Sequence, residues 1–202
     1  PEEQRVGLTP DGARARYSLG TFISYEKVVL EDGTTPLLAP MSRIAGHRGT
    51  DLIAYLLTFM GPGADEIFGD VLVRGDDWAA YTRMTAAYPA RSSEVSLAGK
   101  RLVILGGGVA GRAAAERALA YGAHVTITEV ASRVEWLKAQ LPGAEVVAAD
   151  DTERKVAALT EADGIIGTIY VKGLAPTEID AALLRRISRG HRKVIVDISV
   201  DQ

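Results

Sequence analysis

Six residues in the middle of the chain, Gly106 to Gly111, have the spacing of a phosphate-binding turn. They read Gly-Gly-Gly-Val-Ala-Gly and match the pattern G-x-G-x-x-G. Gly106 would permit a tight turn, Gly108 would let the backbone approach a pyrophosphate, and Gly111 would let the next helix pack closely on the preceding strand. An apolar run, Leu102–Leu105, precedes the motif and an alanine-rich segment follows it. This context predicts a strand, a loop and a helix that together bind a dinucleotide.

The helix that begins after the loop would complete the anion site. Its first turn, which includes Val109 and Ala110 as well as Gly111, presents free N–H groups and the positive end of the helix dipole. The chain contains 21 glycines, so the pattern alone is weak. Two alternatives therefore remain: a glycine turn that binds no nucleotide, and a site for another adenosine cofactor such as a methyl donor.

An acidic residue follows the next apolar run. Glu129 lies 18 residues after Gly111, at the end of Thr126-Ile127-Thr128. A carboxylate at this place accepts hydrogen bonds from the adenine ribose hydroxyls. The same charge repels a 2′-phosphate and so favours NAD over NADP as the cofactor. Arg133 lies nearby and weakens that preference.

The C-terminal half of the chain alternates strands with helices. Strands are predicted at residues 101–105, 124–128, 145–148, 164–169 and 193–198, and helices at residues 110–121, 131–140, 152–162 and 177–188. Most of the strands are continuous apolar runs, as is typical of parallel strands covered on both faces. The fold class is therefore α/β, with a Rossmann-type doubly wound parallel sheet.

The N-terminal half gives weaker signals. Residues 21–30 are rich in β-branched and aromatic types, which predicts a strand, and Asp32-Gly33 predicts a turn after it. Pro40 and Ser42 suit the start of a helix over residues 43–60.

Composition excludes several classes of function. The chain has 202 residues, a formal net charge of −3 and no cysteine. The absence of a basic excess argues against a nucleic-acid partner, and the absence of cysteine excludes disulfides and thiolate-bound zinc. The three histidines are far apart, so no local metal site is expected. No apolar run reaches the ~20 residues that span a bilayer, and a cytoplasmic location is expected.

Four stretches of the chain together resemble one family. They are Arg5–Pro10, Leu37–Gly46, Val103–Gly111 and Val196–Gln202, in that order. The chain is similar in these stretches to the alanine dehydrogenase and pyridine nucleotide transhydrogenase α-subunit family. The resemblance implies a two-domain, self-associating subunit with a cleft between a substrate domain and a nucleotide domain. It also implies reversible, NAD-dependent conversion of alanine to pyruvate and ammonia, or reduction of a related imine.

The same resemblance suggests how this chain is divided. Residues 1–60 would be a partial α/β substrate domain with the interdomain helix, residues 61–98 a connector of unclear structure, and residues 99–202 the NAD-binding Rossmann domain. The family has a catalytic lysine and a catalytic histidine in an interval that Asp11–Gly20 occupies here. We therefore expect either part of a longer enzyme or a reduced relative. The substrate would be a small amino acid or a 2-keto acid, and a homo-oligomer is expected.

Three residues are carried over as catalytic candidates. Arg5 matches the arginine that binds the substrate carboxylate, for which a guanidinium fork is well suited. Asp201 matches the acidic residue after the last parallel strand, near the nicotinamide. His47, on the predicted interdomain helix, could replace the missing acid. The alternatives are a surface arginine, a cap for a helix or turn, and a polar helix face, respectively.

Some features match the transhydrogenase branch instead. There, an arginine, a glutamine and an aspartate of the similar stretch contact the nicotinamide side, and Arg43 and Asp51 match two of them while Arg48 replaces the glutamine. Three functions follow. The first is an NAD(H)-dependent oxidoreductase acting on the C–N bond of a small amino acid or imine. The second is a transhydrogenase-type subunit that passes hydride to another nucleotide, and the third is a non-catalytic NAD-binding module.

Overall fold

The computed structural model describes residues 29–32, 36–59, 95–170, 177–189 and 193–199. Contacts along the chain separate two compact units, Pro1–Ala39 and Pro40–Gln202. In the first unit, Val29 and Leu30 are exposed and lie outside regular secondary structure. The rest of the strand predicted at residues 21–30 lies outside the described residues, as does almost all of the predicted connector.

The strands of the described residues form one parallel five-stranded sheet in the order β3-β2-β1-β4-β5. Their bounds are Arg101–Leu105 for β1, His124–Glu129 for β2, Glu145–Ala148 for β3, Gly164–Gly167 for β4 and Val194–Asp197 for β5. The chain builds outward from β1 to β3 and then crosses back to β4. This order is that of a doubly wound Rossmann sheet and places the topological switch point between β1 and β4. The predicted fold class is confirmed.

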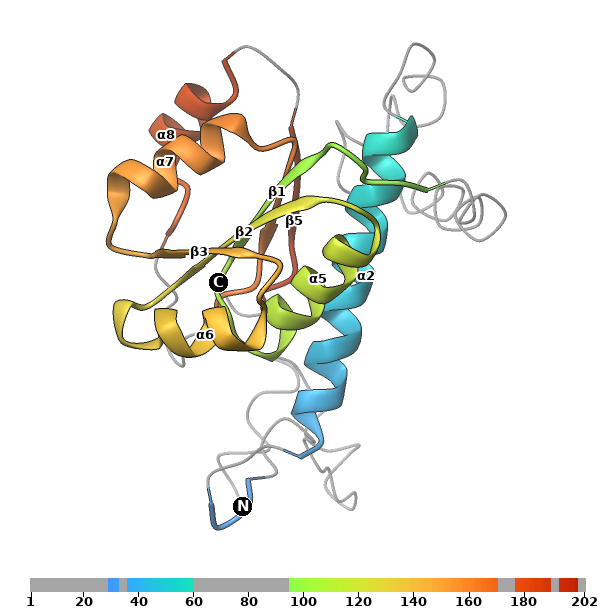
Figure 1. Ribbon diagram of the computed structural model, residues 1–202, viewed down its shortest axis with the longest axis vertical. Helices are drawn as coiled ribbons and strands as arrows, with labels where there is room; N and C mark the ends of the chain where they lie inside the picture. The colour runs from blue at the N-terminus through green and yellow to red at the C-terminus, as the bar shows by residue number, and fades with distance from the viewer. Residues whose placement is uncertain (1–28, 33–35, 60–94, 171–176, 190–192, 200–202) are drawn as a thin grey trace, which may run out of the picture. The chain divides into compact units, whose positions relative to one another are not determined.

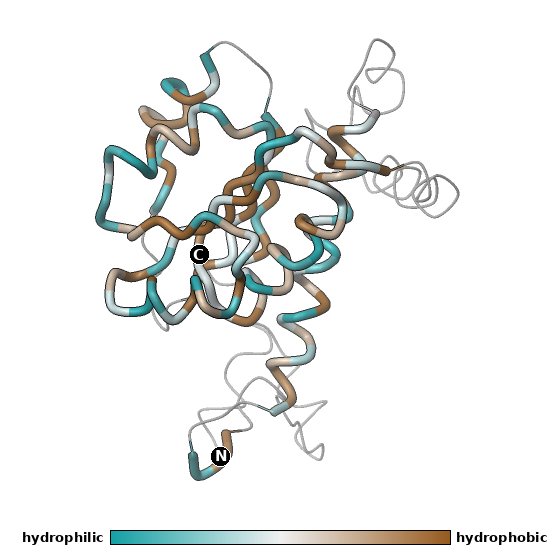
Figure 2. Tube along the Cα trace, in the orientation of Figure 1, coloured by the Kyte–Doolittle hydropathy of each residue, from teal (hydrophilic) through white to brown (hydrophobic). Residues whose placement is uncertain are grey.

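Helices cover the sheet on its two faces (Figure 1). They are α2 (Leu38–Phe59), α5 (Val109–Ala120), α6 (Val134–Gln140) with the short 3-10 helix η4 (Ala131–Arg133) before it, α7 (Thr152–Glu161) and α8 (Ala181–Ile187). Alternate residues of β1 face opposite layers: Ile104 packs in the core that includes α2, α5 and α6, and Val103 packs in the core of α7 and α8. Hydropathy along the trace shows the apolar residues gathered in these central strands (Figure 2). The sheet is therefore buried on both sides, as the apolar runs predict.

The helix after the glycine loop ends in a Schellman motif. Gly122 has a positive φ of 86°, its N–H donates to Leu119 O, and the N–H of Ala123 donates to Ala118 O. These two hydrogen bonds satisfy carbonyl groups that the last turn leaves free. The chain then turns directly into β2 at His124, where the backbone N–H donates to Lys100 O. The predicted end of this helix at Gly122 is confirmed.

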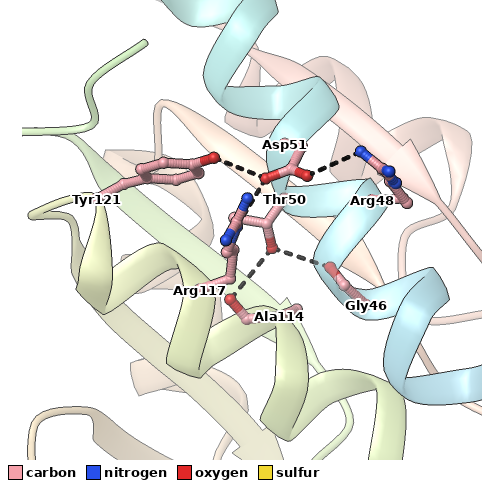
Figure 3. Close-up of polar contacts among 7 residues, drawn as sticks. All are labelled: Gly46, Arg48, Thr50, Asp51, Ala114, Arg117 and Tyr121. Atoms are coloured by element: carbon pink, nitrogen blue, oxygen red, sulfur yellow. Dashed lines mark hydrogen bonds and ion pairs between the residues drawn. The ribbon is translucent and has the colours of Figure 1, made fainter. Parts of the chain in front are cut away.

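Helix α2 packs against α5 so closely that no side chain fits at one contact. A Cβ built on Gly46 would lie 2.1 Å from Ala110 O. One turn along, the Thr50 hydroxyl lies 3.1 Å from both Gly46 O and Ala114 O, so it bridges the two helices (Figure 3). Farther along, Ile53 and Tyr55 are fully buried in the shared core. From Pro40 onward, α2 thus packs as part of the same compact unit as the sheet.

The element bounds differ from the predictions mainly at helix starts. Helix α2 begins at Leu38 rather than 43, because Pro40 falls within the first turn, where a missing N–H costs nothing. Helix α8 begins at Ala181 rather than 177, because Asp180 is its N-cap and accepts from Leu183 N at 2.7 Å. A cap residue lies outside the helical turn that it closes, so residues 177–180 precede the helix.

Candidate functional site

The glycine loop lies at the carboxyl end of β1, beside the switch point of the sheet. Gly106 has a φ of 98°, a backbone conformation that residues with side chains rarely adopt, and its N–H donates to Thr128 O at 3.1 Å. The loop is therefore tied to the end of β2 on one side. It turns sharply into α5, for which Gly108 is the N-cap.

The start of α5 leaves several amides available. The first hydrogen bond of the helix runs from Arg112 N to Gly108 O at 3.0 Å. The N–H groups of Val109, Ala110 and Gly111 precede it and have no acceptor within the helix. Gly108 itself faces open space among the described residues, none of which has an atom within 4 Å of a Cβ built on it. An anion can therefore approach the backbone here, as a pyrophosphate must.

Gly111 makes the tight junction between loop and helix possible. A Cβ on this residue would lie 1.8 Å from Gly106 O and 2.8 Å from Thr168 Oγ1. Any side chain would push the helix off the loop. The third glycine of the motif thus has the close-packing role that the sequence predicts for it.

Thr168, which sequence reasoning missed, fixes the loop from the other side of the switch point. Its Oγ1 lies 2.8 Å from both Leu105 O and Gly106 O, and its N–H donates to Leu105 O at 3.0 Å. The residue is 9% exposed and directly follows β4. A signal was present in the sequence, since Thr168 is the first polar residue after the run Gly164–Gly167. Polar residues at carboxyl ends of parallel strands commonly belong to ligand sites.

We expect Thr168→Val to loosen the glycine loop without disturbing the core. The valine has a similar shape but cannot donate a hydrogen bond to Leu105 O or Gly106 O. The free energy of unfolding should fall by about 1 kcal/mol, the usual size of one lost buried hydrogen bond. Chemical denaturation followed by circular dichroism measures this. Thr168→Ser, which keeps the hydroxyl, serves as the control, and equal losses in both variants would contradict the role.

Glu129 ends β2 and points toward the loop. Its side chain is 8% exposed, and Oε1 accepts from Val130 N at 2.9 Å. Its Oε2 is buried and has no hydrogen-bond donor among the residues described. The same oxygen lies 2.8 Å from the place where a Cβ on Gly107 would be. A buried carboxylate oxygen without a donor beside an anion-binding loop fits a ribose hydroxyl, which would supply the missing hydrogen bond.

Arg133 and Trp136 flank this carboxylate. Arg133 Nη1 lies 3.3 Å from Glu129 Oε2, close enough for an ion pair but without hydrogen-bond geometry. The Arg133 guanidinium stacks on the Trp136 ring at 4.8 Å from its centroid, and Arg112 lies 5.1 Å from the same centroid. Two guanidinium groups thus share one aromatic ring beside the glycine loop.

A second polar cluster joins α2 to the end of α5. Asp51 is 3% exposed, and its Oδ1 accepts from Arg117 Nε and from the Tyr121 hydroxyl, both at 2.8 Å (Figure 3). The hydrogen bond to Asp51 raises the pKa of Arg117 above its ordinary value. Burial, followed by the hydrogen bond to Asp51, raises the pKa of Tyr121. This arrangement joins α2 to the C-terminal end of α5.

Other predicted site residues of α2 are placed as follows. Arg43 pairs with Glu116 of α5 at 2.8 Å, and Arg48 is 72% exposed on its side chain. Arg43 and Asp51 therefore contact α5, and the transhydrogenase-type nicotinamide contact that the resemblance implies for them stays a prediction. His47 is half-buried on α2, and its catalytic role stays a prediction. Arg5 and Asp201 lie outside the described residues.

Two further expectations concern metals and membranes. In the part of the chain that the structure describes, no group of three or more His, Asp or Glu side chains lies together as metal ligands would. Within the same residues, no helix is both long enough and apolar enough to span a bilayer.

The sheet order, the glycine loop at the switch point and the acidic end of β2 define a dinucleotide-binding Rossmann domain. Residues 79–202 match the family model described as the C-terminal domain of alanine dehydrogenase and PNT, the pyridine nucleotide transhydrogenase. The chain belongs to this family, as its sequence motifs predict. NAD is the cofactor of alanine dehydrogenases and their related dehydrogenases.

Individual relatives agree with the family model. The chain is 32% identical to an alanine dehydrogenase of Halomonas elongata, over all of this chain and 46% of that protein. It is 30% identical to an alanine dehydrogenase of Staphylococcus epidermidis, over 89% of this chain and 42% of that protein. A solved L-alanine dehydrogenase superposes with a TM-score of 0.62 at 30% identity, covering 89% of this chain and 44% of that one. The chain thus spans less than half the length of these relatives.

Proposed function

We propose that the chain supplies the NAD(H)-binding part of an oxidoreductase that acts on the C–N bond of a small amino acid or of an imine formed from a 2-keto acid. The observation that carries the proposal is a pair of features: the buried Oε2 of Glu129, which lies beside Gly107 and has no hydrogen-bond donor among the described residues, and the open backbone of the next residue, Gly108. Such a pair accommodates a ribose hydroxyl and a pyrophosphate at once. The family relationship supplies the reaction class.

The residues of this chain hold the cofactor rather than change it. The amides of Val109, Ala110 and Gly111 would bind the pyrophosphate, and Glu129 would accept from the adenine ribose. When bound, NAD supplies the hydride acceptor, and NADH the hydride donor. In the family-based assignment, Arg5 anchors the substrate carboxylate, Asp201 orients the reacting imine, and His47 serves as an acid. The same assignment makes residues 1–60 part of a substrate domain and residues 99–202 the cofactor domain.

The proposal is tested by measuring NADH oxidation at 340 nm with pyruvate and ammonia, and with other 2-keto acids and amines. Turnover with a keto acid and an amine supports an amino-acid dehydrogenase or imine reductase. Isothermal calorimetry with NADH in the same preparations measures binding independently of turnover. Tight binding without any turnover would support a non-catalytic NAD-binding module, and absence of binding would refute the proposal.

A transhydrogenase-type subunit is the second candidate, because the matching family model includes such proteins. This function requires a partner that holds a second nucleotide. It predicts hydride exchange between NADH and a nucleotide analogue in the presence of that partner, with no dependence on keto acid. Turnover with pyruvate and ammonia alone would exclude it as the main activity.

We expect Glu129→Ala to narrow the preference for NAD over NADP. The variant removes the carboxylate that would bind the ribose diol and repel a 2′-phosphate. Affinity for NADH should fall by about tenfold, the effect of losing about one charged hydrogen bond, while affinity for NADPH should change little or rise. The two dissociation constants are measured by calorimetry. If the ratio of the two dissociation constants did not change, Glu129 would not select NAD over NADP.

A further inference from the structure

The carboxylate at the end of β2 does not act alone. Its Oε2, the oxygen that remains for a ribose hydroxyl, is also the oxygen that faces Arg133 Nη1 at 3.3 Å. Glu129 is nearly buried, whereas the Arg133 side chain is 46% exposed. A positive charge this close offsets part of the negative charge that a bound ribose would meet.

The ring of Trp136 holds the guanidinium of Arg133 in place. This guanidinium stacks on Trp136 at 4.8 Å, one turn along the chain, and Arg112 stacks on the same ring at 5.1 Å. Arg112 belongs to the first turns of α5, and its buried Nε has no hydrogen-bond partner among the residues described. The ring thus holds two guanidinium groups near the start of the helix, where the phosphates of a dinucleotide would lie.

We propose that Arg133, stacked on Trp136 and paired with Glu129, is a specificity-determining residue that lets the site bind NADP(H) as well as NAD(H). The inference rests on the proposed dinucleotide function. Glu129 alone would reject a 2′-phosphate, because two negative charges would meet in a partly buried site. Arg133 weakens this repulsion and presents a guanidinium that pairs with phosphate oxygens. The difference in affinity between NAD(H) and NADP(H) is therefore smaller than it would be with Glu129 alone.

The test compares the dissociation constants of NADPH and NADH for the full chain by isothermal calorimetry. For Arg133→Ala, the dissociation constant of NADPH divided by that of NADH should rise roughly threefold to tenfold. This is the effect of losing one partly exposed charge pair. The change should come from weaker NADPH binding, and it should shrink at high salt. Arg133→Lys, which keeps a charge, should restore part of the original ratio.

Two variants separate this effect from charge and from folding. Arg154→Ala removes the same charge from an exposed pair with Glu145, where β3 begins, and should leave the ratio unchanged. Trp136→Leu removes the stacking surface and should raise the ratio in the same direction as Arg133→Ala. An unchanged ratio in Trp136→Leu would overturn the anchoring role of the ring.

The remaining outcomes are distinguishable. If the unaltered chain binds NADH but Arg133→Ala leaves the ratio as it was, or lowers both affinities equally, Arg133 does not determine specificity and the inference is overturned. The proposed function would survive that result. If the unaltered chain binds neither nucleotide, the proposed function and this inference both fail.

Discussion

Replacing Gly108 by alanine is expected to weaken NADH binding by about 10- to 100-fold without changing the stability of the protein. The φ of −67° suits any residue, and the added Cβ would meet no atom of the described part of the chain within 4 Å, so the fold should tolerate it. The same methyl group would occupy the space through which a pyrophosphate reaches the first amides of α5. Loss of about one or two hydrogen bonds to a charged group accounts for the expected size. Calorimetry measures the affinity, and thermal unfolding followed by circular dichroism measures the stability.

Gly111→Ala provides the matched contrast. Its Cβ would lie 1.8 Å from Gly106 O, so the loop and the helix could not pack as they do. This variant should lose both binding and stability, whereas Gly108→Ala should lose binding alone. If Gly108→Ala bound NADH with unchanged affinity, the pyrophosphate would not approach this loop and the proposed site would be wrong.

Replacing Asp51 by alanine is expected to lower the free energy of unfolding by about 2 kcal/mol. The carboxylate is nearly buried and accepts two hydrogen bonds, from Arg117 and from Tyr121. Removing one partner of a buried ion pair costs more than this, but Arg117 is 42% exposed and water can solvate it afterward. Urea denaturation measures the change.

Arg48→Ala is the control for this substitution. Arg48 lies 3.5 Å from Asp51 Oδ2, but its side chain is 72% exposed. An exposed ion pair of this kind contributes less than about 0.5 kcal/mol. If Arg48→Ala lowered the free energy of unfolding as much as Asp51→Ala does, the hydrogen bonds from Asp51 to Arg117 and Tyr121 would not be the source of the stabilisation. The charge of Asp51 would then stabilise the pair of helices instead.

The contact between Asp51 and Tyr121 is expected to make the stability of the protein fall at alkaline pH. The pKa of Tyr121 is raised in the folded protein, by burial first and then by the hydrogen bond to Asp51. A group with a raised folded pKa contributes stability that is fully present below its unfolded pKa, about 10 for tyrosine, and is lost as pH rises through the folded value. The melting temperature should therefore fall above about pH 10, and less steeply in Tyr121→Phe. An identical alkaline profile in both proteins would contradict the coupling.

Local patterns were enough to predict the sheet. Strands β1 and β3 have the bounds predicted from the sequence, because buried parallel strands need nearly continuous apolar sequence. The glycine motif was equally predictable, since the positive φ of Gly106 and the close contact between Gly111 and Gly106 O involve only residues of the loop itself. Strand β4 was predicted to continue to Ile169 but ends at Gly167. Thr168 instead uses its hydroxyl to hold the loop after β1, a contact with residues 62 and 63 positions away.

The contacts between α2 and α5 could not be predicted in the same way. Asp51 and Arg117 are 66 positions apart, and nothing in the sequence pairs them. The resemblance to transhydrogenase relatives implies a nicotinamide contact for Asp51, which stays a prediction, but it gives no sign of the contacts that the carboxylate makes with α5 and Tyr121. A charged residue within a helix has no local pattern that says whether it faces a ligand or another helix.

The absence of a side chain at Gly46 has a consequence for how α2 comes to be ordered. A glycine inside a helix disfavours it by about 1 kcal/mol relative to alanine, and α2 carries a second one at Gly49. The segment is thus a weak helix by composition, even though it is 22 residues long. The helix therefore depends on its packing against Ala110 and Ala114 of α5. We expect α2 to be among the last helices to form and among the first to unfold.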